Sequence, residues 1–254
     1  MRSQNFIMQR VFMPVGQGAF YIEKFNDDFT VVYDCGSYKN ISIVEENIKY
    51  SILDGKIDLL VISHYHEDHI ADLGALRQYR QLYPLGQDGW DGMMLPIYGH
   101  GENEYEFSKL TLDKVSEGHL YDIENGTKVG PFDITFLKTV HPVVNYAMRI
   151  VERRTGQVLI YTGDTGYFDE LTDFAKEADL LLADVYFFKD KAKMPNHLSS
   201  IEAGQIAKDA KVKKLILTHL PQFGDLDILL TEAKEAAGDT VITDLAVPHK
   251  KWQL

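Results

Sequence analysis

Short runs rich in apolar and β-branched residues dominate the start of the chain, a pattern typical of strands. Runs of this kind at 7–15, 19–25 and 29–34 predict three strands, with a turn between the last two. The apolar residues of 42–53 instead recur with helical spacing, and the apolar run at 57–63 predicts a strand buried on both faces. The chain therefore begins with strands and then introduces helices between them.

The same order of elements appears a second time further along the chain. Helical spacing predicts a helix at 69–83 and an apolar run predicts a strand at 93–99, whereas 101–120 is polar and resists assignment. A second series of strands is predicted at 132–140, 145–152 and 157–164. Alternating elements follow, with helices at 168–178, 199–210 and 227–237 and strands at 179–187, 213–219 and 240–247.

Two successive series of strands, each followed by helix–strand units, predict an α/β (α+β) fold. In such a fold two mixed sheets pack face to face with helices outside. No linker rich in Pro, Gly or Ser separates the two series. We therefore expect a single domain over residues 1–254, built as an internal pseudo-repeat.

The charge of the chain limits its partners. The formal charge is −12, from 26 Lys and Arg against 38 Asp and Glu. Such a surface repels nucleic acid and anionic membranes, so neither is expected as a stable partner, and an anionic small molecule would need a locally positive site such as bound metal ions. The chain has one cysteine, Cys35, no apolar signal segment at its start and no apolar run of membrane-spanning length. These features predict a cytoplasmic protein.

The segment "HYHEDH", residues 64–69, concentrates metal-ligand side chains where a predicted buried strand ends. His64 and His66 are two residues apart, so both can face one point. Asp68 and His69 occupy the next turn and can serve a second point. A single histidine at a strand end is usually an ordinary polar residue, but the joint pattern favours a site for two metal ions. Five further candidates lie beside predicted strand ends: His141, Asp164, Asp184, His197 and His219.

This arrangement resembles the metallo-β-lactamase superfamily, whose signature is H-x-H-x-D-H followed by separate His, Asp and His ligands. The first motif matches at every defining position, and Asp34 in "VVYDCGS" stands at the strand-end Asp of the family. The resemblance implies an αββα sandwich with a dinuclear site, whose imidazole and carboxylate ligands suit Zn²⁺, with Mn²⁺ or iron as chemical alternatives. By the same resemblance one metal takes His64, His66 and His141, the other takes Asp68, His69 and His219, and Asp164 bridges both.

The segment "NHLSSIEAGQIAKDA" resembles one in ribonuclease Z and related phosphodiesterases that carries an additional histidine. The resemblance implies that His197 is catalytic and protonates the leaving sugar oxygen, while Asp68 positions the attacking water. The alternative is that His197 only caps or hydrogen-bonds the following helix, whose start is marked by the capping-box spacing of Ser199 and Glu202. Asp184 stands near a Glu of the family pattern and is expected either to orient His197 or another ligand, or to be a structural strand-end residue.

Longer motifs narrow the resemblance to a bacterial and phage branch of the superfamily. Similar motifs are "ISHYHEDHIADLGAL", "LPIYGH", "FDITFLKTVHPVVNYAMRI", "YTGDTGYFDEL" and "LTHLPQFGD", whereas "VGQGAFYIEK" departs from the usual opening of the branch. The branch includes the anti-Pycsar proteins, phosphodiesterases that degrade cyclic mononucleotide defence signals. It implies a homodimeric, metal-dependent hydrolase that acts on 3′,5′-cyclic mononucleotides.

Other functions of the same fold stay open. A ribonuclease Z-like tRNA 3′-processing endonuclease would carry a long arm between His141 and Asp164, but this gap is only long enough for a hairpin. A lactonase or thioesterase would not need His197, and an idle binding module would not need a complete ligand set.

Two smaller expectations concern residues outside the metal motifs. Tyr105 and Phe107 are aromatic residues in a charged stretch, where they could stack on a base or pack a local helix. The remaining histidines match no metal-ligand position and are expected in solvated loops: His100, His119 and His249.

Overall fold

The computed structural model of the chain describes residues 8–12, 21–25, 29–35, 57–71, 73–82, 94–246 and 251–252. Packing divides the chain into two compact units, each described here by itself. The first comprises Met1–Tyr121 and Val247–Gln253, and the second comprises Asp122–Ala246 with Leu254. The expected single domain over 1–254 stays a prediction, and the helix predicted at 42–53 lies outside the described residues.

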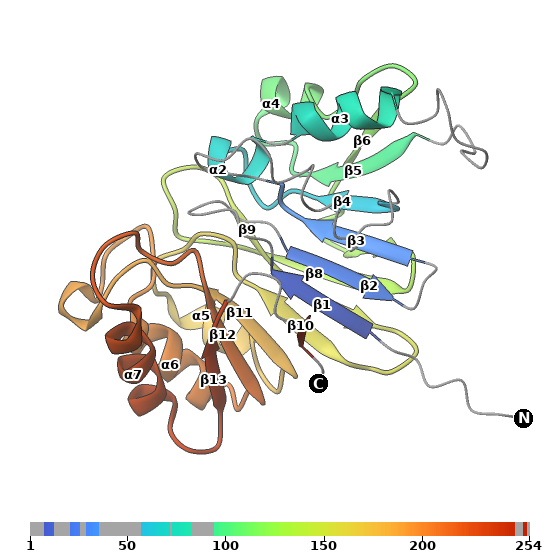
Figure 1. Cartoon of the computed structure of the whole chain (residues 1–254). Helices are drawn as coiled ribbons and strands as arrows, with labels where there is room; N and C mark the ends of the chain where they lie inside the picture. The colour runs from blue at the N-terminus through green and yellow to red at the C-terminus, as the bar shows by residue number, and fades with distance from the viewer. Residues whose placement is uncertain are drawn as a thin grey trace, which may run out of the picture. The chain divides into compact units, whose positions relative to one another are not determined.

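The first unit is built on a seven-stranded mixed sheet. Its strands are β1 (Met8–Phe12), β2 (Tyr21–Phe25), β3 (Phe29–Tyr33), β4 (Leu59–Val61), β5 (Leu95–Gly99), β6 (Ser116–Leu120) and β14 (Lys251–Trp252). In the order β14-β1-β2-β3-β4-β5-β6, the pairs from β14 to β3 are antiparallel and those from β3 to β6 are parallel (Figure 1). The five strands predicted from the sequence in this part of the chain are confirmed.

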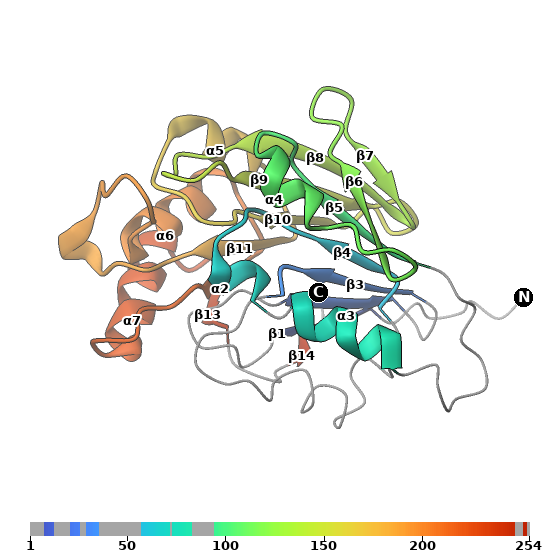
Figure 2. The same cartoon turned by 90° about the horizontal axis from the view of Figure 1, so that it is seen from above.

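Helix α3 (Leu73–Leu82) lies along this sheet (Figure 2) and supplies part of the core of the first unit. Leu73 and Leu76 are buried against strand residues that include Leu60 and Ile97. Fully burying a leucine side chain contributes about 1.5–3 kcal/mol, so these contacts are enough to hold the helix on the sheet.

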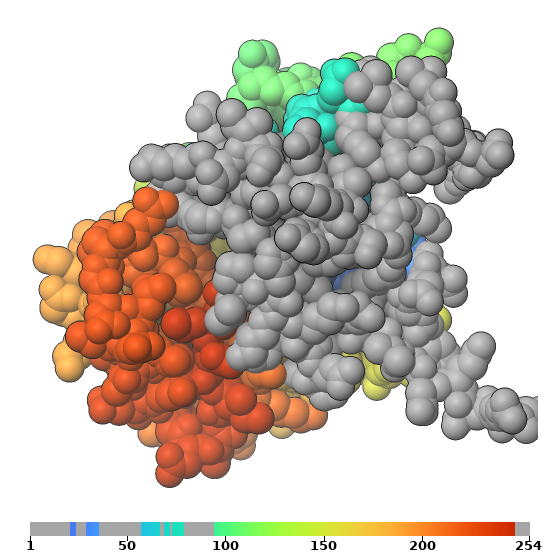
Figure 3. Space-filling model, viewed as in Figure 1, coloured from blue at the N-terminus to red at the C-terminus, as the bar shows by residue number. Residues whose placement is uncertain are grey.

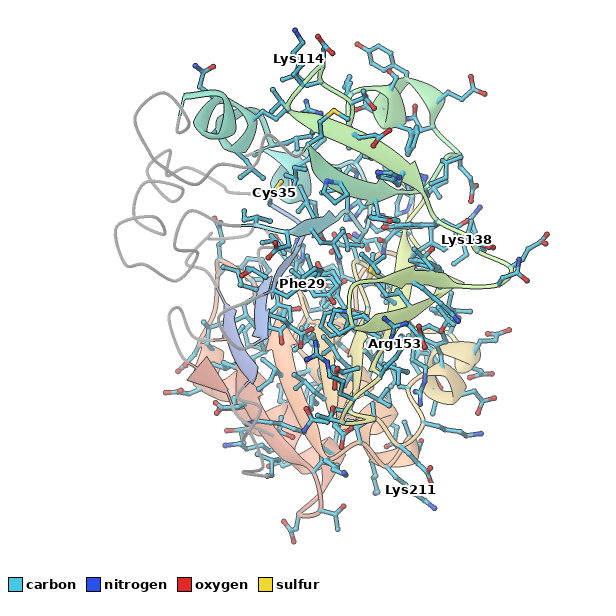
Figure 4. All side chains as sticks on the ribbon, turned by 90° about the vertical axis from the view of Figure 1, so that its right-hand side faces the viewer. Phe29, Cys35, Lys114, Lys138, Arg153 and Lys211 are labelled. Carbon is cyan, nitrogen blue, oxygen red and sulfur yellow. The ribbon has the colours of Figure 1, made fainter. Side chains whose placement is uncertain are left out.

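The helix predicted at 69–83 is in fact two helices, α2 (Glu67–Ile70) and α3. The backbone carbonyl of His69 accepts a hydrogen bond from the N–H of Cys35 (2.7 Å). This bond competes with the regular helical bond that the same carbonyl would accept from residue 73. Cys35 is buried inside the first unit (Figure 4), so the interruption is a tertiary effect that helical spacing does not encode.

The polar stretch 101–120 forms helix α4 (Glu104–Ser108) and strand β6. The side chain of Asn103 caps α4 by accepting a hydrogen bond from the backbone N–H of Glu106 (3.1 Å). Phe107 packs against the core of the first unit, as the local-packing alternative predicts. Tyr105 instead is 70% exposed, with the Lys109 ammonium 4.2 Å from the centre of its ring.

The second unit contains another seven-stranded mixed sheet. Its strands are β7 (Thr127–Val129), β8 (Phe132–Lys138), β9 (Tyr146–Glu152), β10 (Val158–Tyr161), β11 (Leu180–Asp184), β12 (Lys214–Thr218) and β13 (Ile242–Leu245). The pairs from β7 to β10 are antiparallel and those from β10 to β13 are parallel. All six predicted strands are confirmed, β7 is additional, and the change from antiparallel to parallel pairing repeats that of the first unit.

The helices of the second unit are α5 (Asp169–Phe174), the 3₁₀ turn η2 (Lys189–Lys191), α6 (Ser200–Asp209) and α7 (Leu226–Ala237). α6 and α7 lie side by side (Figure 1), and α7 reaches the surface seen in Figure 3. Gly204 permits their close approach, because an added Cβ would lie 2.5 Å from the carbonyl oxygen of Ala233. Within the described ranges, no helix has the length and apolar character to cross a membrane.

Candidate metal centre

In the first unit a buried carboxylate, Asp34, organises the strand ends that precede the histidine motif. β3 and β4 are parallel neighbours, so their carboxyl ends, at Asp34 and Ser63, meet at one edge of the sheet. Asp34 has φ of 52°, a left-handed conformation that Asp tolerates better than most residues. Its carboxylate accepts hydrogen bonds from the Ser63 N–H and the Ser63 hydroxyl, both at 2.7 Å.

Three histidines gather around this edge. The Nδ1 atom of His69 lies 2.8 Å from Asp34 Oδ2, with both side chains buried. This bond assigns the proton to Nδ1 and presents Nε2 as the ligand atom, the usual arrangement of a metal-binding histidine. The rings of His64 and His69 are 4.0 Å apart, and His64 Nε2 lies 3.2 Å from His66 Nδ1. Two imidazole nitrogens at that separation share either a proton or a cation.

The structure locates the backbone of Asp68, the predicted ligand and catalytic residue, in α2. Its side chain lies outside the described part of the chain, so its roles stay predictions.

In the second unit three adjacent parallel strands deliver their end residues to one place. Asp164 follows β10, Asp184 ends β11, and His219 follows β12. The turn before Asp164 is tight, because Gly163 has φ of 55° and an added Cβ would lie 2.6 Å from the side chain of Asn145. The Asn145 amide in turn donates to the backbone carbonyl of Asp164. The sheet therefore positions a carboxylate and an imidazole by the same rule that operates in the first unit.

Three histidines converge on one carboxylate oxygen of this edge. His141 Nε2, His197 Nδ1 and His219 Nε2 lie 4.0, 4.0 and 3.7 Å from Asp164 Oδ2. These separations are too long for hydrogen bonds. Two ligand atoms that each lie about 2.0–2.1 Å from one tetrahedral zinc ion are about 3.3 Å apart. The separations observed here are slightly longer, so the donor atoms are spaced to accept a cation between them. The donor set of the second unit fits a divalent metal.

One hydrogen bond and one close contact with a carboxylate orient two of these rings toward Asp164. His141 Nδ1 lies 3.0 Å from the carbonyl oxygen of Val143 and donates to it. His219 Nδ1 lies 3.2 Å from Asp184 Oδ1. In both residues Nε2 is then the atom that faces Asp164, which repeats the arrangement of His69 in the first unit.

His197 is held differently, by a short bond to Asp184. His197 Nδ1 lies 2.9 Å from Asp184 Oδ2, and the same oxygen accepts the backbone N–H of Thr165 (3.0 Å). The donor atoms of Asp164, Asp184, His197 and His219 all lie within 4.8 Å of one another, so His197 could also join a metal site. The bond to Asp184 engages Nδ1 and positions the imidazole ring.

The alternative that His197 caps α6 is wrong. The N-cap is Ser199, whose N–H and hydroxyl donate to Glu202 Oε2 at 2.9 and 2.7 Å. This confirms the predicted start of the helix and frees His197 for Asp184.

One expectation for the remaining histidines is also wrong, because His100 is fully buried. Its ring centre is 4.6 Å from that of Tyr65, whose hydroxyl donates to the His100 carbonyl oxygen (2.8 Å). Tyr65 stands between two histidines of the motif, and burial raises its pKa above the ordinary range. The position of His100 directly after the apolar strand β5 is the feature of the sequence that could have indicated its burial.

Comparisons with known proteins agree with this geometry. Residues 41–220 match the model of the beta-lactamase superfamily domain. The chain belongs to the metallo-β-lactamase superfamily. Among its superfamily relatives is the probable metallo-hydrolase YhfI of Bacillus subtilis, 41% identical over 208 residues that make up 82% of each chain. The crystal structure of YhfI matches with a TM-score of 0.84 and 34% identity, over 96% of this chain and 98% of that one.

Two further known proteins resemble the chain. Ribonuclease Z of Listeria monocytogenes is 28% identical over 311 aligned positions, covering 94% of this chain and 98% of that protein. A diphosphatase of the PhnP family has the same fold, with a TM-score of 0.71 at 17% identity over 98% of each chain. The protein is thus a metal-dependent hydrolase with two mixed sheets, as the sequence predicts.

Proposed function

We propose that the protein is a dinuclear metal phosphodiesterase that hydrolyses 3′,5′-cyclic mononucleotides to linear nucleoside monophosphates. The observation that carries the proposal is the Asp184–His197 pair beside Asp164. It supplies a proton donor that a ribose leaving group requires and that a lactone or a thioester does not.

The proposed ligands are those of the superfamily pattern. His64, His66 and His141 hold one ion, Asp68, His69 and His219 hold the other, and Asp164 bridges both. The oriented Nε2 atoms of His69, His141 and His219 support this assignment in each unit. Zn²⁺ is the proposed ion and Mn²⁺ the alternative, since both accept imidazole and carboxylate ligands. When bound, two such ions withdraw charge from phosphoryl oxygens and lower the pKa of the attacking water.

His197 acts as the general acid in this proposal. With Nδ1 bonded to Asp184, its Nε2–H is the proton that can pass to the departing 3′ oxygen. Asp184 holds the ring in that orientation and stabilises its charged form, as a carboxylate partner does in hydrolytic triads. Asp68 positions the attacking water.

Several observations favour this function over its alternatives. The segment from His141 to Asp164 contains only the antiparallel pair β9 and β10, so it has no long arm for tRNA. The alignment with ribonuclease Z is longer than this chain, so that relative carries insertions that this protein lacks. A lactone or thioester needs no residue like His197, because a thiolate in particular leaves without a proton.

The biological proposal follows the resemblance. A homodimeric enzyme of this specificity would remove cyclic-pyrimidine Pycsar signals. Small anionic substrates are also consistent with a chain of net charge −12, since local cations rather than the whole surface must attract them.

The test is a substrate panel assayed with and without chelator. It contains 3′,5′-cyclic nucleotides, a tRNA precursor, a lactone and a thioester. We expect chelator-sensitive hydrolysis of the cyclic nucleotides alone, and preferential cleavage of the tRNA precursor or the lactone would reject the proposal.

A further inference from the structure

A row of aromatic rings leads away from the proposed acid in the second unit. The ring centre of Tyr186 lies 5.2 Å from that of His197 and 5.8 Å from that of His219. The ring of Phe223 follows at 5.9 Å from Tyr186 and nearly perpendicular to it, and Phe188 lies 6.5 Å beyond Phe223. We call Tyr186, Phe188 and Phe223 the aromatic shelf.

The loop that carries Phe223 has a defined shape. It joins β12 to α7 (Figure 1) and ends at Asp225, whose side chain caps α7 by accepting the Asp227 N–H (2.9 Å). Gly224 has φ of 82°, and a Cβ added there would lie 2.5 Å from the Phe188 ring. Only glycine suits that position, so the turn presses against Phe188 and places Phe223 next to it.

Phe223 is nevertheless 56% exposed. An isolated exposed apolar residue needs no explanation. Here, however, Tyr186 connects the exposed ring to the rings of His197 and His219, and Phe188 packs on its other side. The structure keeps an aromatic face open beside its reactive groups.

We propose that the aromatic shelf is the subsite for the base of a nucleotide substrate, with Phe223 as its stacking residue. The proposal rests on the proposed function. The phosphorus must lie by His197, and Phe223 is one ring further away. In a nucleotide, one sugar ring likewise separates the phosphorus from the base. Stacking on an aromatic ring tolerates every base, so the shelf predicts a requirement for a base without a strong preference among bases.

The test measures the binding of 5′-AMP and of ribose 5-phosphate by calorimetry to metal-loaded protein. The two ligands differ only in the base, so their comparison isolates its contribution. The variants are Phe223→Ala, Phe223→Trp and the control Ile228→Ala. Ile228 lies on α7 just after the loop and is 53% exposed, which matches the exposure of Phe223.

We expect Phe223→Ala to weaken binding of 5′-AMP about 5- to 100-fold, the range for loss of one base–aromatic stack, and to leave ribose 5-phosphate unchanged. Phe223→Trp should retain wild-type binding, and Ile228→Ala should bind both ligands as the wild type does. For a hydrolysed cyclic nucleotide, the KM of Phe223→Ala should rise by the same factor at constant kcat.

Equal binding of 5′-AMP by wild type and Phe223→Ala would overturn the subsite, as would parallel losses for both ligands. So would an altered oligomeric state at unchanged binding, because it would make the shelf a contact between copies. The proposed reaction fails separately: if no cyclic nucleotide is hydrolysed but Phe223→Ala still removes the base-dependent binding, the subsite stands without that reaction. If a cyclic nucleotide is hydrolysed but wild type and Phe223→Ala bind 5′-AMP equally, the proposed reaction stands and the subsite is rejected.

Discussion

The role of His197 can be tested by the dependence of its removal on the leaving group. His197 is only 13% exposed, and its one short bond is to Asp184 (2.9 Å). A positioned general acid contributes about 10²–10⁴-fold to rate, which corresponds to about 2.7–5.5 kcal/mol of barrier. His197→Ala should therefore lower kcat on a 3′,5′-cyclic nucleotide by that factor.

The same variant should hardly affect a substrate whose leaving group departs without being protonated. Nitrophenolate has a conjugate acid of pKa about 7 and barely needs a proton, so we expect a loss of less than about 10-fold on bis(p-nitrophenyl) phosphate. His64→Ala serves as the contrasting variant, because it removes a proposed metal ligand and should reduce both activities alike.

His197→Asn separates proton donation from architecture. An amide can still donate to Asp184 but has no proton to transfer, so this variant should behave like His197→Ala on both substrates. Metal content and melting temperature are measured for every variant. Equal losses of His197→Ala on the two substrates would show that the residue holds the site together, and no loss on either would refute the acid and weaken the case for diester hydrolysis.

Three further predictions concern the metals, the carboxylate partner and the helix contact. Metal analysis of protein purified with zinc or manganese and without chelator should find two ions per chain; fewer than one would contradict the dinuclear site. Asp184→Asn should lower kcat on a cyclic nucleotide about 10- to 100-fold, the equivalent of one charged hydrogen bond, and should speed metal loss to chelator because Asp184 also lies 3.2 Å from His219. Gly204→Ala should lower the free energy of unfolding by about 1–3 kcal/mol, since its Cβ meets the Ala233 carbonyl oxygen at 2.5 Å. Gly74→Ala, within α3 where an added Cβ meets no atom within 4 Å, should be neutral or slightly stabilising in the same denaturant titration, and equal effects would refute the close-contact explanation.

The strands, and the polar residues that lie at their ends, were predictable because both depend on local order in the chain. A buried strand needs a short apolar run, and a polar residue directly after it must lie at a sheet edge. Thus 57–63 predicted β4 and placed His64 at its end, and 157–164 did the same for β10 and Asp164. Nothing beyond neighbouring residues is needed for these conclusions.

Other features depend on residues distant in the chain, and there the sequence misled or gave no signal. The break between α2 and α3 accompanies a bond from the Cys35 N–H, which a helical pattern cannot reveal. His100 looked like a solvated residue but is fully buried beside Tyr65, because the fold covers the end of β5. Strand β6 has a mixed burial pattern and few apolar residues, so periodicity could not identify it.

The orienting carboxylates show why the two units carry similar sites. In each sheet the pairing changes from antiparallel to parallel, and the parallel strands bring their carboxyl ends to one edge. A buried aspartate stands there in both units, Asp34 in the first and Asp184 in the second. Each accepts a backbone N–H from a neighbouring loop, of Ser63 or of Thr165, and each bonds to Nδ1 of a histidine further along the chain, His69 or His197.

This arrangement has a physical cause. A carboxylate buried at a strand end must be satisfied by hydrogen bonds, and the N–H groups of the adjacent loop are the nearest donors. Once held, it has a fixed direction in which to accept an imidazole N–H, so the ring turns its second nitrogen toward the centre of the site. In the first unit that nitrogen belongs to a proposed metal ligand, His69. In the second unit Asp184 bonds to His197, the proposed general acid, and its other oxygen lies 3.2 Å from Nδ1 of His219, a proposed metal ligand.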